Sequence, residues 1–280
     1  MPDTGFPLSD AQADFGRARR RRVLAALADR LRGEPDDVRV ILPFNEVLEA
    51  LGHAGSHDLG LQSIPLDTVV GTADQRGGDF DRSFRPMTGR VRGRWERIAL
   101  AERRGEAMPP IDVYRIGELH FVRDGHHRVS VARARRRTHI EAYVREVRTK
   151  LDPGRSMRVS DLALKSHERL FYERVPLPPG WRARIDLPDY WGYAVLAEAV
   201  EAWGFRASQE VGEFLNREEV ARRWFEEEYE PVVEMLREAQ LLGDLSEAQA
   251  YMRVSAERYR LMRTHQWSDE AIERVRRELR

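Results

Sequence analysis

Alternating and helical spacings of apolar residues predict a unit of strands around one helix between residues 111 and 147. Apolar and polar positions alternate near both ends of this stretch, as they do in half-buried strands. Asp124-Gly125 separates the second strand from a segment with helical spacing. The predicted order is strand 111–116, turn 117–118, strand 119–122, helix 128–134 and strand 139–144.

The turn before the predicted helix is a candidate anion site. A helix that opens after a glycine leaves several backbone N–H groups without an intrahelical acceptor, and the helix dipole adds positive character there. Gly125, His126, His127, Arg128 and Ser130 occupy this position, which favours a phosphate ligand. The alternative is a solvated turn in which Asp124 only caps the helix.

This stretch resembles the ParB/sulfiredoxin superfamily. The matching segments are Ile64-Pro-Leu-Asp67, Pro110-Ile-Asp-Val113 and Asp124-Gly-His-His-Arg128, and they cover about a third of the chain. Sulfiredoxins carry Gly-Cys-His-Arg at the turn and partition proteins carry Gly-Glu-Arg-Arg. His126 stands at the cysteine position, and the chain contains no cysteine. Thiol-dependent sulfinic-acid reduction is therefore excluded.

The resemblance implies a domain that binds a nucleoside triphosphate, ATP or CTP, with Mg²⁺. Hydrolysis or phosphotransfer, including transfer to a small acceptor, would then use Asp124 and Asp67 as candidate catalytic groups. Two alternatives come with the same family: a DNA-associated partition or transcription regulator, and a nuclease. A scaffold that has lost its activity is the remaining interpretation.

Two further groups of charged residues could assist such a site. Asp79 and Asp81 could hold Mg²⁺ beside a phosphate, or could cap turns and pair with neighbouring arginines. Residues 90–104 have helical spacing, and Arg92, Arg94 and Arg97 on that helix would suit a polyanion. The alternative is a solvated helix with ion pairs between successive turns.

The N-terminal pattern predicts a helix over residues 11–31 with Val23, Leu24, Leu27 and Leu31 as its buried stripe. A strand at 38–42 and a helix at 45–51 follow, or else one kinked helix over 36–51. The segment from His53 to His57 is expected to be a loop because of its glycines. The arginine run at 17–22 is interpreted as a solvated helix face rather than a nucleic-acid contact.

The second half of the chain is predicted to be helical. Helices are expected at 159–173, at 190–203 with a break at Gly204, at 216–235 with a disruption at Pro231, at 246–265 and from Ser268 onward. Residues 176–180 cannot form regular structure on this pattern. A helix-turn-helix over 196–216 is disfavoured because Glu210 occupies a position that should be apolar. This half is interpreted as a packing or oligomerisation module, and a homodimer is compatible with it.

Composition agrees with a globular protein of the cytoplasm. The chain has 280 residues, a net charge of zero and 34% charged residues, and no segment has the length and apolarity of a membrane span. Residues 1–150 carry 27 basic and 22 acidic side chains, whereas residues 151–280 carry 20 and 25. The basic first half permits a nucleotide or DNA partner.

We therefore expect an α+β fold in three parts. Residues 1–60 form a helical extension, 61–150 a ParB/sulfiredoxin-like nucleotide-binding domain with a small mixed sheet, and 151–280 an all-helical domain.

Overall fold

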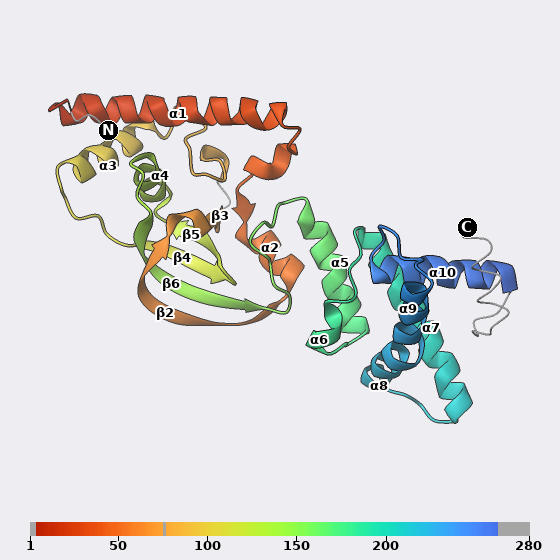
Figure 1. Cartoon of the computed structure of the whole chain (residues 1–280). Helices are drawn as coiled ribbons and strands as arrows, with labels where there is room; N and C mark the ends of the chain where they lie inside the picture. Colours follow the sequence, from red (N-terminus) through yellow and green to blue (C-terminus); the bar gives the residue numbers. More distant parts are fainter. Residues whose placement is uncertain (1–3, 75–76, 263–280) are drawn as a thin grey trace. The chain divides into compact units, whose positions relative to one another are not determined.

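The computed structural model describes residues 4–74 and 77–262 (Figure 1). The chain forms two compact units, Met1–Ser166 and His167–Arg280, and each is described by itself. The first unit combines a mixed sheet with helices, and the described part of the second is helical. The mixed composition agrees with the predicted α+β class.

The sheet of the first unit has six strands in the order β1-β3-β5-β4-β6-β2. β1, β3 and β5 run parallel, β4 is antiparallel to β5 and parallel to β6, and β2 is antiparallel to β6. The strands are β1 (Leu42–Pro43), β2 (His53–Pro65), β3 (Val69–Thr72), β4 (Ile111–Ile116), β5 (Leu119–Asp124) and β6 (His139–Thr149). The predicted sequence of strand, turn, strand, helix and strand after residue 111 is confirmed.

Helices pack around this sheet, with α1 against α3 and α3 against α4 (Figure 1). The helical elements of the unit are α1 (Pro7–Leu31), η1 (Asp36–Arg39), α2 (Phe44–Leu51), η2 (Leu66–Thr68), η3 (Gly77–Asp79), α3 (Arg92–Arg103) and α4 (His126–Ala134). Trp95 of α3 is fully buried and donates its indole N–H to the hydroxyl of Ser130 on α4, at 2.8 Å. The edge of the Phe15 ring meets Trp95 at a centroid distance of 5.5 Å. The core of the unit therefore joins all three helices.

The predicted buried stripe of α1 is wrong. Val23, Leu24, Leu27 and Leu31 are 54–80% exposed, and the buried face lies in the first half of the helix. That face comprises Asp10, Ala11, Asp14, Phe15 and Ala18. The small residues let α1 approach α3 closely, and two of the five positions are acidic, so the hydrophobic pattern does not reveal the face.

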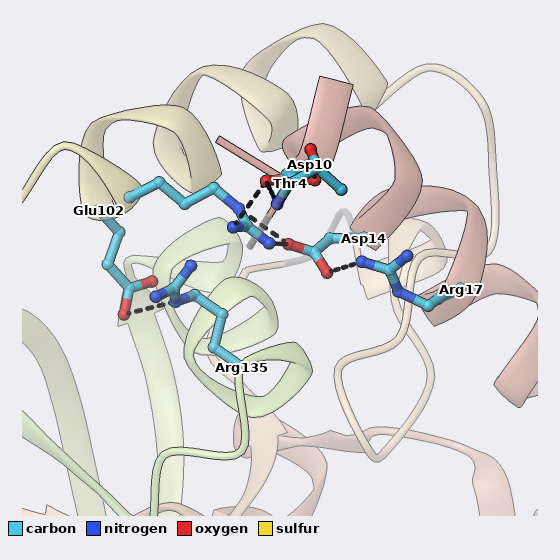
Figure 2. A network of polar contacts seen from close by, with 7 residues as sticks. Thr4, Asp10, Asp14, Arg17, Glu102 and Arg135 are labelled. Atoms are coloured by element: carbon cyan, nitrogen blue, oxygen red, sulfur yellow. Dashed lines mark hydrogen bonds and ion pairs between the residues drawn. The ribbon is translucent and has the colours of Figure 1, made fainter. Parts of the chain in front are cut away.

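A buried ion-pair network compensates these two acids (Figure 2). The Arg103 guanidinium of α3, whose side chain is 6% exposed, lies 2.5 Å from the Asp14 carboxylate and 3.4 Å from that of Asp10. Asp14 also accepts from Arg17, and Asp10 accepts from the backbone N–H and the hydroxyl of Thr4. Full pairing is what makes buried charges tolerable in this interface.

The segment between α1 and β3 also differs from the prediction. The expected strand at 38–42 is reduced to η1 and the two-residue β1, and the alternative of one helix over 36–51 is also wrong. The expected loop at His53 is the start of the long strand β2, most of which lies within residues 1–60. The first 60 residues thus contribute two strands to the sheet instead of forming a separate helical extension.

The described part of the second unit consists of helices. They are α5 (Asp161–Arg174, which begins in the first unit), α6 (Pro179–Arg182), α7 (Tyr190–Val211), α8 (Arg217–Trp224), the π-helical η4 (Phe225–Tyr229), α9 (Glu230–Glu238) and α10 (Glu247–Met262). Asn216 and Glu219 form the capping box of α8, and the helix is disrupted before Pro231, as predicted. The helices predicted after Ser268 and at the end of 246–265 lie outside the described residues.

Two predictions for this unit are wrong. α7 continues through Gly204, where a Cβ atom would lie 2.4 Å from the Val220 side chain. This glycine therefore permits close packing of α7 against α8 and does not end the helix. Pro179 and Gly180, the end of the stretch 176–180 that was expected to be irregular, lie in the short helix α6. Among the described helices, none combines the length and the apolarity that crossing a membrane requires.

Candidate functional site at the start of helix α4

The turn between β5 and α4 has a backbone that only glycine accommodates. Gly125 has φ of 109°, in the left-handed region, and precedes the first residue of α4. A Cβ atom at this position would lie 2.4 Å from Cγ2 of Ile111, a buried residue at the start of β4. Close packing against Ile111 therefore fixes the turn. The first N–H groups of α4, at His126 and His127, have no intrahelical acceptor.

His126 connects this turn to the end of β3. Its Nε2 lies 2.7 Å from the hydroxyl of Thr72, which also accepts the backbone N–H of Asp74 at 3.0 Å. Burial lowers the pKa of His126, and the nearby Arg94 cation acts in the same direction against Asp74 and Asp124. His126 is therefore neutral at pH 7 and serves as a hydrogen-bonding group.

His127 lies against an aromatic ring. Its ring meets Phe80 edge-on at 5.3 Å, and its buried Nδ1 has no hydrogen-bond partner among the described residues. Burial, together with the charges of Arg94 and His126, lowers the pKa of His127 to about 4, although Asp79 opposes this. The two histidines at the turn thus contribute no positive charge at pH 7, contrary to the simplest interpretation of the sequence.

Arg128 uses its hydrogen bonds to stabilise the loop around the turn. Its guanidinium donates to the carbonyl oxygens of Pro109 and Pro110, at 2.7 and 2.6 Å, and pairs with Asp124 at 2.5 Å. The Arg128 side chain is 14% exposed and that of Asp124 is 59% exposed. In this arrangement Arg128 positions the turn, and the exposed Arg94 is a cation that acts on both histidines at the helix N-terminus.

The remaining candidate residues have internal partners or lie elsewhere. Ser130 is buried and accepts from Trp95, so its hydroxyl points into the core. Asp67 is exposed and lines a cavity of about 840 Å³ beside the C-terminal part of α4. Because a nine-residue helix is roughly 13 Å long, Asp67 and Asp124 belong to opposite ends of α4 and form no catalytic pair.

Asp79 and Asp81 stabilise the loop that precedes α3. Oδ1 of Asp79 accepts from the Thr88 hydroxyl at 2.9 Å, and Oδ1 of Asp81 accepts from the backbone N–H groups of Ser83 and Arg85. Within residues 4–74 and 77–262, no three His, Asp or Glu residues cluster as a metal site would require. The turn-capping alternative therefore describes both aspartates.

The three arginines proposed for a polyanion differ in their contacts. Arg92 pairs with Glu96 at 2.6 Å and lies over the Phe15 ring, whereas Arg97 donates only to the backbone oxygen of Gly93 at 3.4 Å. Arg94 is exposed and is close enough to both turn histidines to lower their pKa values. Of the three, Arg94 is the one that adjoins the turn.

Comparisons with known proteins leave this site as the basis for any functional conclusion. No protein-family model, curated protein or solved structure matches the chain.

The structure adds two residues to the site that sequence reasoning missed, Thr72 and Phe80. Thr72 ends β3, which runs parallel to β5, so both strands deliver their carboxyl ends to the same edge as the helix N-terminus. This edge is where ligands bind in open sheets with parallel strands. A polar residue at the end of a short apolar strand was the available signal for Thr72. No local signal marks Phe80.

Proposed function

We propose that the protein binds a nucleoside triphosphate, ATP or CTP, with its phosphates at the N-terminus of α4. The observation that supports this most is the fixed turn at Gly125, where free N–H groups of α4 adjoin the Thr72 hydroxyl and the Arg94 cation. A preorganised turn of this kind binds phosphate without rearranging. The resemblance to the ParB/sulfiredoxin superfamily favours the same ligand.

The assignment of roles differs from the one suggested by the motif alone. Backbone N–H groups of His126 and His127 would hold the phosphate oxygens, with Thr72 as a neutral donor and Arg94 as the counter-charge. Arg128 would act indirectly by holding the turn. Mg²⁺ would arrive with the phosphates, since it usually keeps several waters and needs only one or two carboxylates; Asp79 is the nearest of the proposed ligands to His127.

We propose binding rather than turnover as the primary activity. A phosphotransferase or hydrolase needs a group that orients the nucleophile, and the two candidates Asp124 and Asp67 lie at opposite ends of α4. Asp124 is already paired with Arg128. Incubation with labelled ATP and CTP tests this point, because steady release of phosphate would assign a catalytic role that binding alone does not require.

Thermal unfolding in the presence of nucleotides tests the proposal. ATP, CTP, GTP and UTP are compared with and without Mg²⁺, and a ligand at a hundred times its Kd should stabilise the fold by about 2.7 kcal/mol. Arg94→Gln and Thr72→Val should remove the shift. Arg97→Gln, on the same exposed helix, is the matched control. If no nucleotide shifts the transition, the proposal fails.

Arg128→Ala is a weaker test of the same idea. Its guanidinium satisfies two backbone carbonyl oxygens and the Asp124 carboxylate, so the variant would loosen the turn whether or not Arg128 contacts a ligand. Arg94 is exposed and has no acidic partner among the described residues, so we expect Arg94→Gln to leave the fold intact.

A DNA-associated role is the second candidate, and one observation favours it. Arg19, Arg20 and Arg92 line a hollow of about 530 Å³ over α1 and α3, together with the apolar Val23 and Leu24. A labelled duplex that binds at low salt and dissociates steeply as salt rises would support it. Absence of a shift at low salt would leave nucleotide binding alone.

A further inference from the structure

A cavity of about 840 Å³ lies at the opposite end of α4 from the turn. It is lined by α1, the η2 region, the loop before α3, the C-terminal part of α4 and the start of β6. Five arginines contribute to its walls: Arg21, Arg82, Arg85, Arg133 and Arg137. Asp67 is the acidic residue among the described lining residues.

Arg133 forms a fixed positive wall of this cavity. Its guanidinium donates to the carbonyl oxygens of Leu66, Val69 and Arg82, and it lies 5.4 Å from the centre of the Phe84 ring. Burial lowers the pKa of Arg133 to about 10, so the group remains charged at neutral pH. Neutral carbonyl groups hold the guanidinium in place, and no carboxylate among residues 4–74 and 77–262 forms an ion pair with it.

Arg82 and Arg85 add charge that is only partly satisfied. One terminal N–H group of Arg82 donates to the carbonyl oxygen of Met157 at 2.7 Å. The other terminal nitrogen is buried and has no hydrogen-bond partner among the described residues. One terminal nitrogen of Arg85 is likewise buried without a hydrogen-bond partner among the described residues. Both side chains are half-buried and line the cavity, so their guanidinium charges act on an anion bound there at short range.

The surrounding acids neutralise this cluster only in part: Asp161 and Asp37 act on Arg82, and Asp81 and Asp67 act on Arg133. Glu102 accepts from Arg137 and Arg135. Asp81 lies close enough to Arg133 to raise its pKa, but the first carboxylate oxygen of Asp81 is used by backbone N–H groups. Arg21, on α1, has no acidic partner in the part of the chain that the structure describes. The positive charges of Arg21, Arg82 and Arg85 therefore remain available.

The rest of the lining combines apolar residues with the polar Asp67, Ser83, Ser130, Thr138 and His139. Pro65, Leu66, Val70 and Ala134 lie between the arginines, so the cavity offers a hydrophobic surface framed by cations. Ligand cavities of this size enclose molecules as large as a nucleotide. A ligand that matches the lining has an organic framework for the apolar surface and at least two anionic groups for arginines on different walls.

We propose that this cavity binds a small molecule that carries two or more phosphate groups. The site differs from the proposed nucleotide site because its lining on α4 begins at Ser130 and because it uses side-chain guanidinium groups instead of backbone N–H groups; Phe84, which lines the cavity, packs against His126 at 6.1 Å. Arg133 fixes the orientation of one phosphate, and Arg21, Arg82 and Arg85 bind the charge on the facing side.

Isothermal titration with inorganic pyrophosphate and with glucose 1,6-bisphosphate tests this site. Arg85→Gln and Arg21→Gln should each weaken binding at least tenfold. Arg20→Gln, the neighbouring arginine of α1 outside the cavity, should leave binding unchanged, as should Thr72→Val at the turn. The unfolding transition of each variant is measured first, and Arg21→Gln serves if Arg85→Gln fails to fold.

The possible outcomes separate this proposal from the nucleotide site. If Thr72→Val abolishes pyrophosphate binding and Arg85→Gln does not, the anion occupies the turn and the cavity proposal is wrong. If both ligands fail to bind at millimolar concentration, it is also wrong. A single-stranded oligonucleotide whose affinity rises with length and depends on Arg85 would replace the small molecule with a nucleic-acid backbone.

Discussion

The two ends of α4 offer two different kinds of candidate anion site. At its start, one contiguous segment supplies the turn, two neutral histidines and free backbone N–H groups. Arg128 of the same segment donates its hydrogen bonds to backbone carbonyl oxygens of the protein. At its end, arginines from separate segments surround a cavity, and the backbone contributes carbonyl oxygens that hold Arg133. A sequence motif can mark the first kind of site, whereas only the folded chain brings the second kind together.

The comparison between the two ends of α4 depends on how rigidly each end is held. Among the substitutions considered, Gly125→Ala should lower the free energy of unfolding most. The left-handed backbone disfavours a side chain by about 1–2 kcal/mol, and contact with Ile111 adds about 1–3 kcal/mol. We expect a loss of about 4 kcal/mol in the free energy of unfolding, measured by urea denaturation.

Gly93→Ala provides the control for that substitution. Gly93 lies in α3 with open space around its Cα, so alanine should be neutral or should stabilise by up to about 1 kcal/mol. If Gly125→Ala were as stable as Gly93→Ala, the turn would not be fixed in the way described.

The cavity end is tested by Arg133→Met, which keeps much of the packing over Phe84 but removes the donor. Three backbone carbonyl oxygens lose their partner, and unsatisfied buried acceptors cost about 1–3 kcal/mol each when water cannot reach them. We expect a loss of about 3 kcal/mol by urea denaturation. A change below about 1 kcal/mol would show that water replaces the guanidinium and that the wall is less rigid than its hydrogen bonds indicate.

Acid should weaken the turn end through His127. The folded-state pKa of about 4 lies below the ordinary value of 6.5, so the unfolded chain binds more protons between these values. The contribution of neutral His127 to the free energy of unfolding is therefore fully present above pH 6.5 and is lost as the pH falls toward 4. From pH 7.5 to 5 this residue should account for a loss of roughly 2 kcal/mol.

His127→Gln should reduce that pH dependence, because the buried Nδ1 has no partner to lose among the described residues. Urea denaturation at pH 7.5 and at pH 5 measures the difference, and the exposed His139→Gln is the control. Equal pH dependence in the wild type and in His127→Gln would contradict the buried, neutral state of this histidine.

Arg85→Gln should have the smallest effect on stability, and its sign is informative. Removing a cation with a buried, unpaired nitrogen should change the free energy of unfolding by less than about 0.5 kcal/mol or should raise it slightly. The same substitution should remove anion binding at the cavity. A large loss of stability would show that Arg85 is structural, and the contrast between the two ends of α4 would then weaken.

Much of the first unit could be predicted because its strands and α4 have clear periodicity, from Ile111 to the start of β6. The face of α1 could not, because its contact surface contains Asp10 and Asp14, whose burial depends on Arg103, 89 residues after Asp14. The apolar residues later in α1 make a clear stripe that the described part of the chain does not cover. Periodicity identifies amphipathic helices but not buried ion pairs.

The glycines misled the prediction in two different ways. Gly55 suggested a loop, but Gly55 and Gly60 lie at the two register shifts of β2, with φ of 125° and 72°, where bulges accommodate them within the strand. Gly204 suggested a helix end, but it accommodates Val220 of α8. Gly55 and Gly60 therefore serve a backbone conformation with open space around them, whereas Gly204 serves a contact with a residue of the next helix.

The candidate site was predicted only in its contiguous part. The turn at Gly125 and the histidines were identified from their order in the sequence, but the commitment of Arg128 to Pro109 and Pro110 depends on how β4 approaches the turn. The arginines of the cavity come from positions 21 to 137, and each of them alone resembles a solvated surface residue. No spacing rule relates them.

The paired charges of Asp10, Asp14 and Arg103 have a consequence for the way α1 is assembled onto the rest of the unit. Among the apolar residues of this face, Ala11 and Ala18 are small, so Phe15, through its contact with Trp95, is the main apolar obstacle to a shift of α1 by one helical turn. The same shift would bury two carboxylates without their guanidinium, at a cost of several kcal/mol. The ion pairs therefore add a requirement of charge to the requirement of shape that Phe15 sets, and both select the same alignment of α1.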